Sequence, residues 1–565
     1  MEKLTGLTVV VLVVGLVVSS AESKTIHVKV GGTGDGSSWA SAYWDLQDAL
    51  NDADPNDEIW VAAGTYKPTW DYNIDYGDRG KHFRLINGVG IYGGFPNTGD
   101  PVWADRDPDT WETILSGDLA GNDGSVANPE DLLSDPNRSE NCYNVFSHHR
   151  RIDIEPNAVL DGFTITGGNA NYSGVYDEGG GMYNYDSNPT VTHCTFRDNS
   201  AIYGGGIYSN DSNQTLIHCA FTGNSAEYGG GMYCSYSDSL TLDHCTFSGN
   251  FAELGGGVYH EYSDSSMVRN CTFSENSGGE YGGGIYSYHN SGTVTGCMFR
   301  GNYVRYGGGI HNEYFVGSVT NCTFSGNSAL HEQGGGMHNS YGTQIVAGCA
   351  FSGNVAEYGG GMYNRRNNVT VTQCAFYDNR GQRAGVGMHN CDCSPVVTNC
   401  IFWDNTATDY PQIFGVPSVT FSNVQGGWEG MGNIDVDPCC ANPGYWEDPC
   451  GTGDYFWDDI FVPGDYHLKS QGGRYDPTTQ AWVYDDVTSP CIDAGNPLSP
   501  IGAEPFPNGG VVNMGAYGGT SEASKSYFGK PPCEIIVAGD VNGDCVVDFL
   551  DFHLIALHWC EDNNP

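Results

Sequence analysis

Residues 242–257 read LDHCTFSGNFAELGGG, and residues 268–284 read VRNCTFSENSGGEYGGG. The same pattern occurs in nine units, each with a cysteine, a phenylalanine two residues later and an asparagine five residues after the cysteine. Successive cysteines are 25 to 27 residues apart, at Cys194, Cys219, Cys245, Cys271, Cys297, Cys322, Cys349, Cys374 and Cys400. A fixed period of this length is the signature of a stacked repeat architecture.

Each unit has the composition of short strands and turns. A valine or leucine stands three residues before every cysteine, and a triple glycine followed by Met, Ile or Val opens most units. The units show no helical period, and each has room for two or three strands. Because a strand advances about 3.3 Å per residue, about 26 residues make one turn of a three-sided coil. Strands of successive coils then pair in parallel.

This stacking predicts the fold. We expect an all-β solenoid, a parallel β-helix of about nine regular coils with irregular coils at both ends. The cysteine, phenylalanine and Val/Leu columns form its core. The residue before each cysteine is mostly Asn, Gly or His, which tolerate the left-handed conformation and therefore mark a corner. The asparagine after it predicts a second corner, with stacked amides bonded in a ladder.

The charge balance limits the possible partners. The chain has 23 basic and 68 acidic residues, a net charge of −45. Such a charge disfavours binding to nucleic acid and to anionic membranes, and it suits cation binding. No lysine lies between Lys81 and Lys469, so we predict no basic groove and no nucleic-acid partner.

The first residues have the order of a signal peptide. Lys3 precedes an apolar run over 7–18 and small residues at 19–21. The run is shorter than the roughly 20 residues that a membrane helix needs. We therefore predict cleavage, a secreted or cell-surface location and no membrane span after cleavage; a retained anchor is the alternative.

The loss and return of the period divide the chain. We predict a signal peptide over 1–21, an N-terminal cap and early irregular coils with insertions over 22–158, regular repeats over 159–407, irregular C-terminal coils and a cap over 408–530, and a calcium-loop tail over 531–565. Residues 44–50 predict a short amphipathic helix that covers the N-terminal end, and residues 59–66 predict the first strand.

The nine repeat cysteines are predicted to be free and buried, since side chains stacked in register point in parallel and fit disulfide geometry poorly. Bridges are expected among the cysteines of the turns and the C-terminal region, with zinc as the disfavoured alternative for the close pairs 391/393 and 439/440. The cysteines expected to form bridges include Cys391, Cys393, Cys439, Cys440, Cys450, Cys491, Cys533, Cys545 and Cys560.

Oxygen-bearing side chains near the C-terminus follow the order of an EF-hand-type calcium loop. Asp540, Asn542, Asp544, Asp548 and Asp551 occupy loop positions 1, 3, 5, 9 and 12. Position 6 holds a cysteine where glycine is usual, and position 12 holds Asp in place of Glu. We predict calcium as the cofactor; a solvated acidic turn is the alternative.

The calcium loop and the amphipathic segment 549–559 resemble one half of a type I dockerin. That family carries two such calcium repeats and docks on a cohesin, and this sequence holds one repeat. The resemblance implies a small helical tail and a cohesin-like partner.

The repeats resemble the right-handed parallel β-helix proteins, including pectate-lyase-like and polymorphic outer-membrane-protein-like chains, over about residues 25–520. The resemblance implies a right-handed solenoid of the pectin-lyase-like kind. This fold hosts lyases, hydrolases, epimerases and adhesins, so it does not fix the function. The Asn-Thr-Asp, Gly-His-Gly and Arg-Ile-Lys motifs of polygalacturonase-like enzymes are absent, and no lysine base lies in the regular repeats.

Three columns of polar or aromatic side chains are predicted on the surface. Tyrosines follow the core residue after the glycines and point away from the core by strand alternation, so they either contact glycan or stack on one another. They are Tyr183, Tyr208, Tyr233, Tyr259 and Tyr286, continued by histidines and Tyr363. An acidic column precedes the glycines and is interrupted by Arg305; it is either a solvated turn or a cation site. Its members are Asp177, Glu227, Glu253, Glu280, Glu332 and Glu357. His193, His218 and His244 favour a corner over a metal site.

The sequence thus favours an extracellular β-helix protein with a structural, carbohydrate-binding or cell-envelope-binding role of the adhesin kind. The alternative is a carbohydrate-active enzyme, a polysaccharide lyase or glycoside hydrolase, tethered through the dockerin-like tail. The lack of recognised catalytic motifs and the uniformity of the repeats favour the first.

Overall fold

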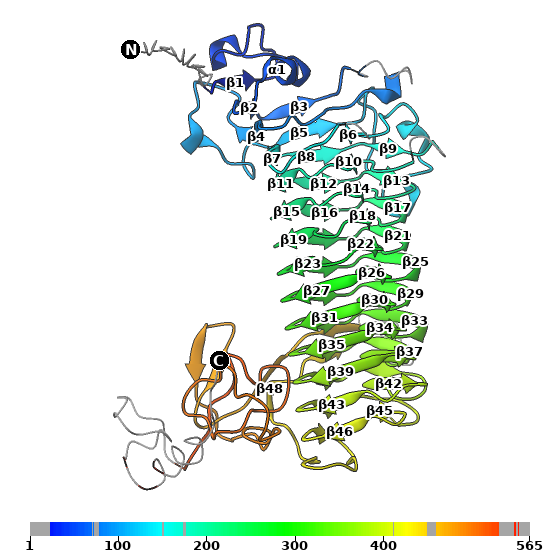
Figure 1. Ribbon diagram of the computed structural model, residues 1–565, viewed down its shortest axis with the longest axis vertical. Coiled ribbons are helices and arrows are strands. Elements are labelled where there is room, and N and C mark those ends of the chain that lie inside the picture. Colours follow the sequence, from blue (N-terminus) through cyan, green and yellow to red (C-terminus); the bar gives the residue numbers. More distant parts are fainter. Residues whose placement is uncertain are drawn as a thin grey trace, which may run out of the picture.

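A computed structural model describes residues 23–70, 72, 78–149, 152–172, 177–410, 412–448 and 459–529, together with 547, 549 and 552. Most of these residues form one long parallel β-solenoid (Figure 1). The predicted fold class is confirmed: about nine regular turns of about 26 residues stack on one another, with almost no helix.

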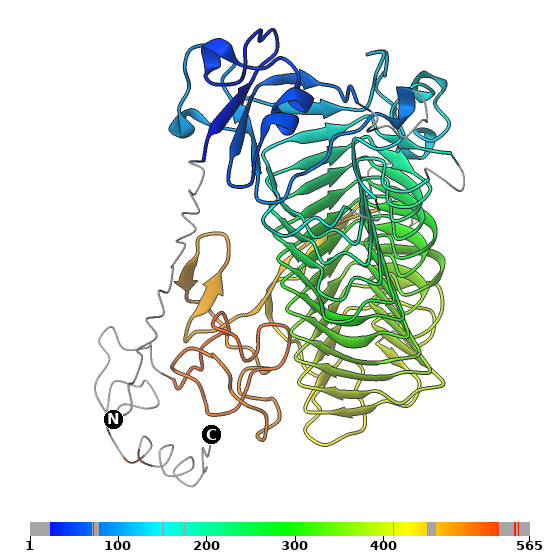
Figure 2. The ribbon, with the colours of Figure 1, turned by 45° about the horizontal axis from the view of Figure 1, so that its top comes forward.

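Four parallel sheets run along the solenoid, and Figure 2 shows their coils stacked below the N-terminal region. Sheet A has 14 strands, from β1 (Thr25–Val28) to β46 (Ser418–Thr420), and sheet B has 13, from β3 (Gly64–Tyr66) to β47 (Asn423–Val424). Sheet C has 11 strands, from β6 (Phe146–His148) to β45 (Ile413–Phe414), and sheet D has 9, from β9 (Asn169–Ala170) to β41 (Arg380–Gly381).

A regular coil contains four strands, one more than the sequence predicts. One coil runs through β18 (Met232–Ser235), β19 (Thr241–Asp243), β20 (Thr246–Ser248) and β21 (Phe251–Leu254). The extra division lies at the triple glycine. The first of its glycines, Gly229, has φ +68°, which bends the chain between β17 (Ser225–Tyr228) and β18 and starts a new side.

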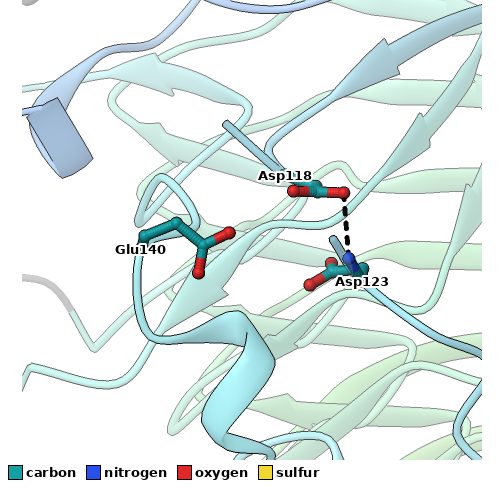
Figure 3. A group of neighbouring side chains, drawn as sticks. All are labelled: Asp118, Asp123 and Glu140. Atoms are coloured by element: carbon teal, nitrogen blue, oxygen red, sulfur yellow. Dashed lines mark hydrogen bonds between the residues drawn. The ribbon is translucent and has the colours of Figure 1, made fainter. Parts of the chain in front are cut away.

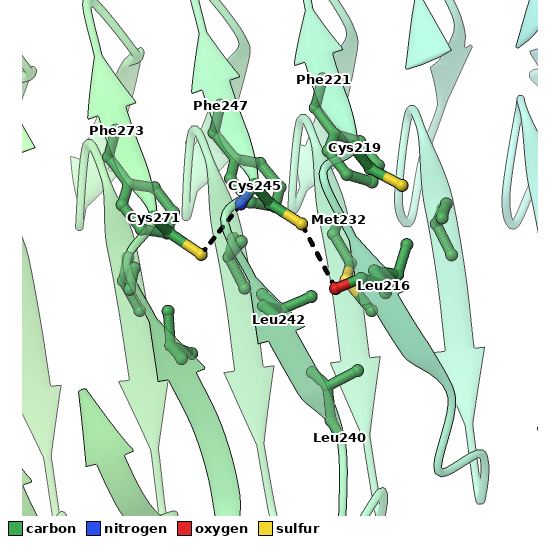
Figure 4. Packing of buried hydrophobic residues seen from close by; sticks show 14 of the residues in the cluster. Leu216, Cys219, Phe221, Met232, Leu240, Leu242, Cys245, Phe247, Cys271 and Phe273 are labelled. Carbon is green, nitrogen blue, oxygen red and sulfur yellow. Dashed lines mark hydrogen bonds between the residues drawn. The ribbon is translucent and has the colours of Figure 1, made fainter. Parts of the chain in front are cut away.

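The core is made of in-register columns, as Figure 4 shows for the cysteines and phenylalanines. Phe247 pairs with Phe221 and Phe273, and its ring centroid lies 4.5 Å and 4.9 Å from theirs. The nine repeat cysteines are free and buried, as predicted. Burial raises the pKa of the Cys322 thiol well above its ordinary value, so this thiol stays protonated and donates to the backbone carbonyl of Val294 at 3.7 Å.

The bridges predicted elsewhere are not found among the described cysteines. Cys391, Cys393, Cys439, Cys440 and Cys491 are free thiols. The sulfur of Cys393 instead donates to a backbone oxygen at 3.5 Å, and the sulfur of Cys491 accepts from an asparagine amide at 3.1 Å. Cys450, Cys533, Cys545 and Cys560 lie outside the described residues.

Both predicted corners occur, the second one residue earlier than expected. The residue before the repeat cysteine has positive φ, as in His218 (52°) and Asn270 (54°). At the second corner, positive φ falls on the residue before the asparagine, as in Glu275 (56°). The asparagine itself is buried, because its side chain is needed inside to bond the coil above and the coil below.

The predicted asparagine ladder is present. The Nδ2 of Asn276 donates to the Phe247 carbonyl and to the Oδ1 of Asn302, both at 2.9 Å. The same oxygen of Asn302 accepts the backbone N–H of Asn276 at 3.1 Å. Each amide thus bonds three coils together and satisfies backbone groups that the corner leaves without ladder partners.

The N-terminal end is covered as the sequence predicts. Helix α1 (Leu46–Asp52) begins two residues later than expected, because Asp45 is its N-cap and accepts the backbone N–H of Gln47 at 2.9 Å. The strand predicted at residues 59–66 is not the first, because β1 precedes it and pairs with it in parallel, and it is divided into β2 (Glu58–Ala62) and β3. The predicted signal peptide lies outside the described residues, and none of the helices described has the length and apolar composition of a membrane span.

Residues of the C-terminal region pack beside the solenoid, as Figures 1 and 2 show. Strand β48 (Cys440–Asn442) pairs antiparallel with β51 (Asp465–Leu468). Tyr466 lies against Tyr377 with ring centroids 5.1 Å apart, within a cluster that includes Ala350 of sheet B and Met514. The region therefore covers the outer side of sheet B near the last coils.

Glu504 makes the stability of this region depend on pH. Its Oε1 accepts the backbone N–H groups of Asn513 and Gly519, each at 2.8 Å, and burial raises its pKa from 4.5 to about 7. A raised folded-state pKa means that its stabilisation is complete below pH 4.5 and is lost as the pH rises through about 7.

We expect Glu504→Gln to raise the free energy of unfolding at pH 8 by about 3 kcal/mol and to leave it nearly unchanged at pH 4.5. Thermal unfolding of both proteins between these values measures the difference. Glu429→Gln, at an exposed carboxylate, is the control. An equal shift at both pH values would contradict the assignment.

Candidate functional site: the tyrosine face

The five tyrosines predicted to contact glycan lie on the outer side of sheet C. They are the second residues of β10 (Met182–Tyr185), β14 (Ile207–Asn210), β18, β22 (Val258–Glu261) and β26 (Ile285–Tyr288). Their neighbours Met182 and Ile207 point into the core, and pairing in register places each tyrosine beside the next. We call the outer side of sheet C and its two flanking turns the tyrosine face.

The tyrosine rings cover one another. Tyr183 and Tyr208 lie 5.3 Å apart and Tyr208 and Tyr233 lie 5.2 Å apart, each pair with an interplanar angle of 1°. Tyr208 is 6% exposed, and Tyr233, Tyr259 and Tyr286 are also buried. This is the self-stacking arrangement that the sequence left open. The rings pack against one another, face to face from Tyr183 to Tyr233 and edge to face between Tyr233 and Tyr259, where the interplanar angle is 80°. We call this largely buried column the tyrosine floor.

Carboxylates bind the hydroxyl groups of this floor. The hydroxyls of Tyr233 and Tyr259 both donate to Glu261, the latter at 2.8 Å, and the hydroxyl of Tyr286 donates to Glu313 at 3.2 Å. Burial, together with these carboxylates, raises the pKa of Tyr233 and Tyr259 well above the ordinary phenol value. The phenols therefore remain hydrogen-bond donors across the physiological pH range.

A second aromatic column, which the sequence analysis missed, lies at the turns that follow five consecutive strands of sheet C. Tyr236, Tyr262 and Tyr314 are 53%, 40% and 39% exposed. The column consists of Tyr236, Tyr262, His289, Tyr314 and Tyr341, with centroid distances of 5.4, 5.5, 4.2 and 5.0 Å. The signal for it is an aromatic residue three positions after the floor residue in five consecutive units. We call it the exposed aromatic column.

The opposite flank of the tyrosine face carries the acidic column predicted from the sequence, which runs from Asp177 to Glu357 along sheet D. Its carboxylates are partly neutralised within the column, because Arg305 pairs with Glu280 at 3.1 Å and with Glu332 at 3.2 Å. Arg383 pairs with Glu357 at 2.5 Å in the same way. The arginine that interrupts the acidic pattern thus bridges the coils before and after it, which relieves the repulsion between stacked carboxylates.

The histidine column lies at the corner between sheets A and B, away from the tyrosine face. The rings of His193 and His218 stack at 5.2 Å. His193 contacts Asp161 at 3.1 Å and His244 contacts Asp243 at 2.8 Å. All three histidines have positive φ, which agrees with the corner assignment.

Two grooves border the C-terminal and N-terminal regions. One, of about 310 Å³, lies between the last coils and the C-terminal region and is lined by residues that include Asn321, Tyr517 and Glu522. The other, of about 300 Å³, lies at the N-terminal end and is lined by Trp44, Tyr66 and other residues. The five residues predicted to bind calcium at the C-terminus, Asp540, Asn542, Asp544, Asp548 and Asp551, lie outside the described residues.

The stacked parallel sheets define a β-helix protein, and a family model agrees. The model described as the right handed beta helix region matches residues 141–314 and 256–423, which together span half of the chain. The chain belongs to this family, so the predicted right-handed parallel β-helix is confirmed. No curated protein matches the chain.

Three solved structures are similar at low identity. Tailspike protein 3 of bacteriophage CBA120 is 10% identical, with a TM-score of 0.38 over 82% of this chain and 69% of its own. The complex of XylC with xylose is 11% identical, with a TM-score of 0.35 over 76% and 88%. Pectate lyase Pel9A is 12% identical, with a TM-score of 0.33 over 88% and 96%.

Proposed function

We propose that this is an extracellular β-helix protein whose tyrosine face binds a polysaccharide or cell-envelope glycan. The observation that carries the proposal is the exposed aromatic column, which runs over five consecutive coils beside the tyrosine floor. A repeating surface of this kind fits a repeating ligand, because each coil offers the same contacts one step further along the axis.

The chemistry of the face suits sugar rings. Tyrosine and histidine rings offer apolar surface to the C–H groups of a sugar, while phenol hydroxyls and carboxylates bond its hydroxyl groups. Tyr236 has a ring neighbour, Tyr262, on one side, and Asp211 stands at the same turn of the preceding coil. Its other side therefore faces a small polar residue, which suits a sugar stacked at the end of the column.

The charge of the face favours a neutral glycan. Glu261 and Glu313 lie within the face, the acidic column lies beside it, and the whole chain carries a charge of −45. An acidic polysaccharide is repelled by such a surface unless cations screen it. We therefore expect neutral polysaccharides to bind more tightly than polyuronates.

Binding of the mature protein to a glycan array tests the proposal. We expect the double variant Tyr236→Ala, Tyr262→Ala to bind its best neutral glycan about tenfold more weakly, because each ring contributes about 0.5–1.5 kcal/mol and 1.4 kcal/mol is a factor of ten. Tyr445→Ala, at an equally exposed tyrosine of the C-terminal region, is the matched control. Unchanged affinity in the double variant, or no binding of the parent protein to any glycan, would contradict the proposal.

We also propose that the C-terminal loop binds calcium and that the tail docks a cohesin-like partner. The support is the spacing of the oxygen ligands from Asp540 to Asp551 and the resemblance of this segment to a dockerin repeat. Calcium-dependent pull-down with a cohesin module, lost in Asp540→Asn with Asp544→Asn, tests both parts. The predicted signal peptide supports a secreted or cell-surface location for such docking.

A further inference from the structure

The long insertion before the regular coils brings three carboxylates together. Asp118, Asp123 and Glu140 each offer an oxygen, and these oxygens all lie within 4.8 Å of one another. Figure 3 shows the carboxyl groups of the three residues around a common space. In the part of the chain that the structure describes, no other group of His, Cys, Asp and Glu side chains meets this condition.

Backbone amides hold the first carboxylate in place. One oxygen of Asp118 accepts the N–H groups of Gly121 and Asn122 at 2.6 and 3.2 Å, and the other accepts the N–H of Asp123 at 3.2 Å. The loop 118–123 is thereby closed on its own first side chain. This contact fixes Asp118 and Asp123 relative to each other, as the dashed line in Figure 3 marks.

Several oxygens around the cluster are buried and have no donor. They belong to Asp123 (Oδ1), Glu140 (Oε1) and Asn141 (Oδ1). Asn141 is fully buried, and its amide nitrogen donates to the Oδ2 of Asp123 at 2.7 Å and to the Gly167 carbonyl at 2.8 Å, so the nitrogen of this side chain faces the carboxylates. A buried oxygen without a donor is costly, and a cation bound by Asp123 and Glu140 removes this cost for their two oxygens.

The positive groups near the cluster leave these oxygens free. Arg138 contacts the Oδ2 of Asp123 at 3.3 Å, on the opposite carboxyl oxygen from the unpartnered one. The Nε of Arg79 donates to the backbone oxygen of Asn141 at 2.7 Å, and the Nζ of Lys67 donates to that of Leu119 at 3.4 Å. Burial raises the pKa of Asp123, and the negative charges of Asp118 and Glu140 act in the same direction. A divalent cation would counter both causes.

We propose that Asp118, Asp123 and Glu140 bind a calcium ion. The donors are all oxygens and come from loop 118–123 and a separate segment, which suits the irregular coordination of Ca²⁺ better than the strict octahedron of Mg²⁺. The ion would join loop 118–123 to the segment that Arg138 fastens to the solenoid through the carbonyls of Gly168 and Asp198, each at 2.9 Å.

Hydrogen exchange of the full mature chain tests the site, with one sample in EDTA and one in about 5 mM CaCl₂. This calcium concentration is about five times the weakest Kd of extracellular calcium modules, roughly 10⁻³ M. The variant Asp540→Asn, Asp544→Asn serves as the background, so that calcium at the C-terminal loop does not contribute. We expect calcium to slow exchange in peptides covering 117–142. Adding Glu140→Gln should weaken the apparent calcium affinity about tenfold or more, since one charged ligand is lost.

Glu130→Gln, at an exposed carboxylate of the same insertion, is the matched control and should retain the response. If calcium leaves exchange over 117–142 unchanged in the background variant, the site does not exist. If Glu140→Gln and Glu130→Gln lower the affinity equally, calcium is attracted by the general negative charge and the proposal is likewise overturned. Neither result bears on glycan binding by the tyrosine face.

Discussion

Replacing Asn276 with alanine is expected to lower the free energy of unfolding by about 3–6 kcal/mol. The Oδ1 of Asn276 accepts both the backbone N–H and the Nδ2 of Asn250, at 3.1 and 2.9 Å. Its own Nδ2 donates to the Phe247 carbonyl. The substitution removes these bonds from the Asn250 N–H and the Phe247 carbonyl, and it removes one of the two bonds of the Asn250 Nδ2, which still donates to Phe221 at 2.9 Å. Each buried bond left unmade costs about 1–3 kcal/mol.

Urea unfolding followed by circular dichroism measures this loss. Asn213→Ala makes the same chemical change at an exposed asparagine, whose side-chain oxygen accepts the backbone N–H of Ser239 at 2.7 Å. Its cost should stay within about 0.5 kcal/mol, as for most surface positions. If Asn276→Ala lowers the free energy of unfolding by less than about 1 kcal/mol, water or a rearranged corner must bond the groups that lose Asn276. The asparagine ladder would then not be a main source of stability.

Replacing Phe299 with alanine is expected to cost about 3–5 kcal/mol. The ring of Phe299 is fully buried and lies 4.8 Å from Phe273 and 4.8 Å from Phe324. Its removal leaves a gap in a continuous stack, which the paired strands on both sides cannot close without losing their register.

The residue before it provides the control. Met298 lies on the same strand, β28 (Met298–Arg300), points outward and is 46% exposed. Met298→Ala removes a side chain of similar length without opening the core, so its cost should be within about 0.5 kcal/mol. The two variants are compared by thermal and urea unfolding. Equal losses would show that the phenylalanine column is not the main source of core packing.

Much of the fold could be predicted because a solenoid converts sequence period into spatial columns. The cysteine, phenylalanine and asparagine of one unit stand directly beside those of the next, as the pairings of Phe247 show. The corner residues could also be predicted, since positive φ restricts them to the few residue types that occur there. The outward direction of the tyrosines followed from strand alternation.

Other features of the site could not be predicted from a single unit. Whether Tyr208 exposes its ring depends on its distance from Tyr183 and Tyr233, and the turn geometry makes Tyr236 the exposed ring instead. Arg305 reads as an interruption of the acidic column, but in three dimensions it bridges the carboxylates of two other coils.

By itself, the sequence determined the repeat, the core columns and the outward tyrosine row, because these depend on contacts that recur at one fixed separation along the chain. The tertiary structure decided the four-sided coil, the side on which the C-terminal region packs, and the meeting of Asp118 and Asp123 with Glu140. These depend on turn angles and on contacts between segments that share no period. Such contacts leave no repeating signal in the sequence, and they form only once the chain has folded.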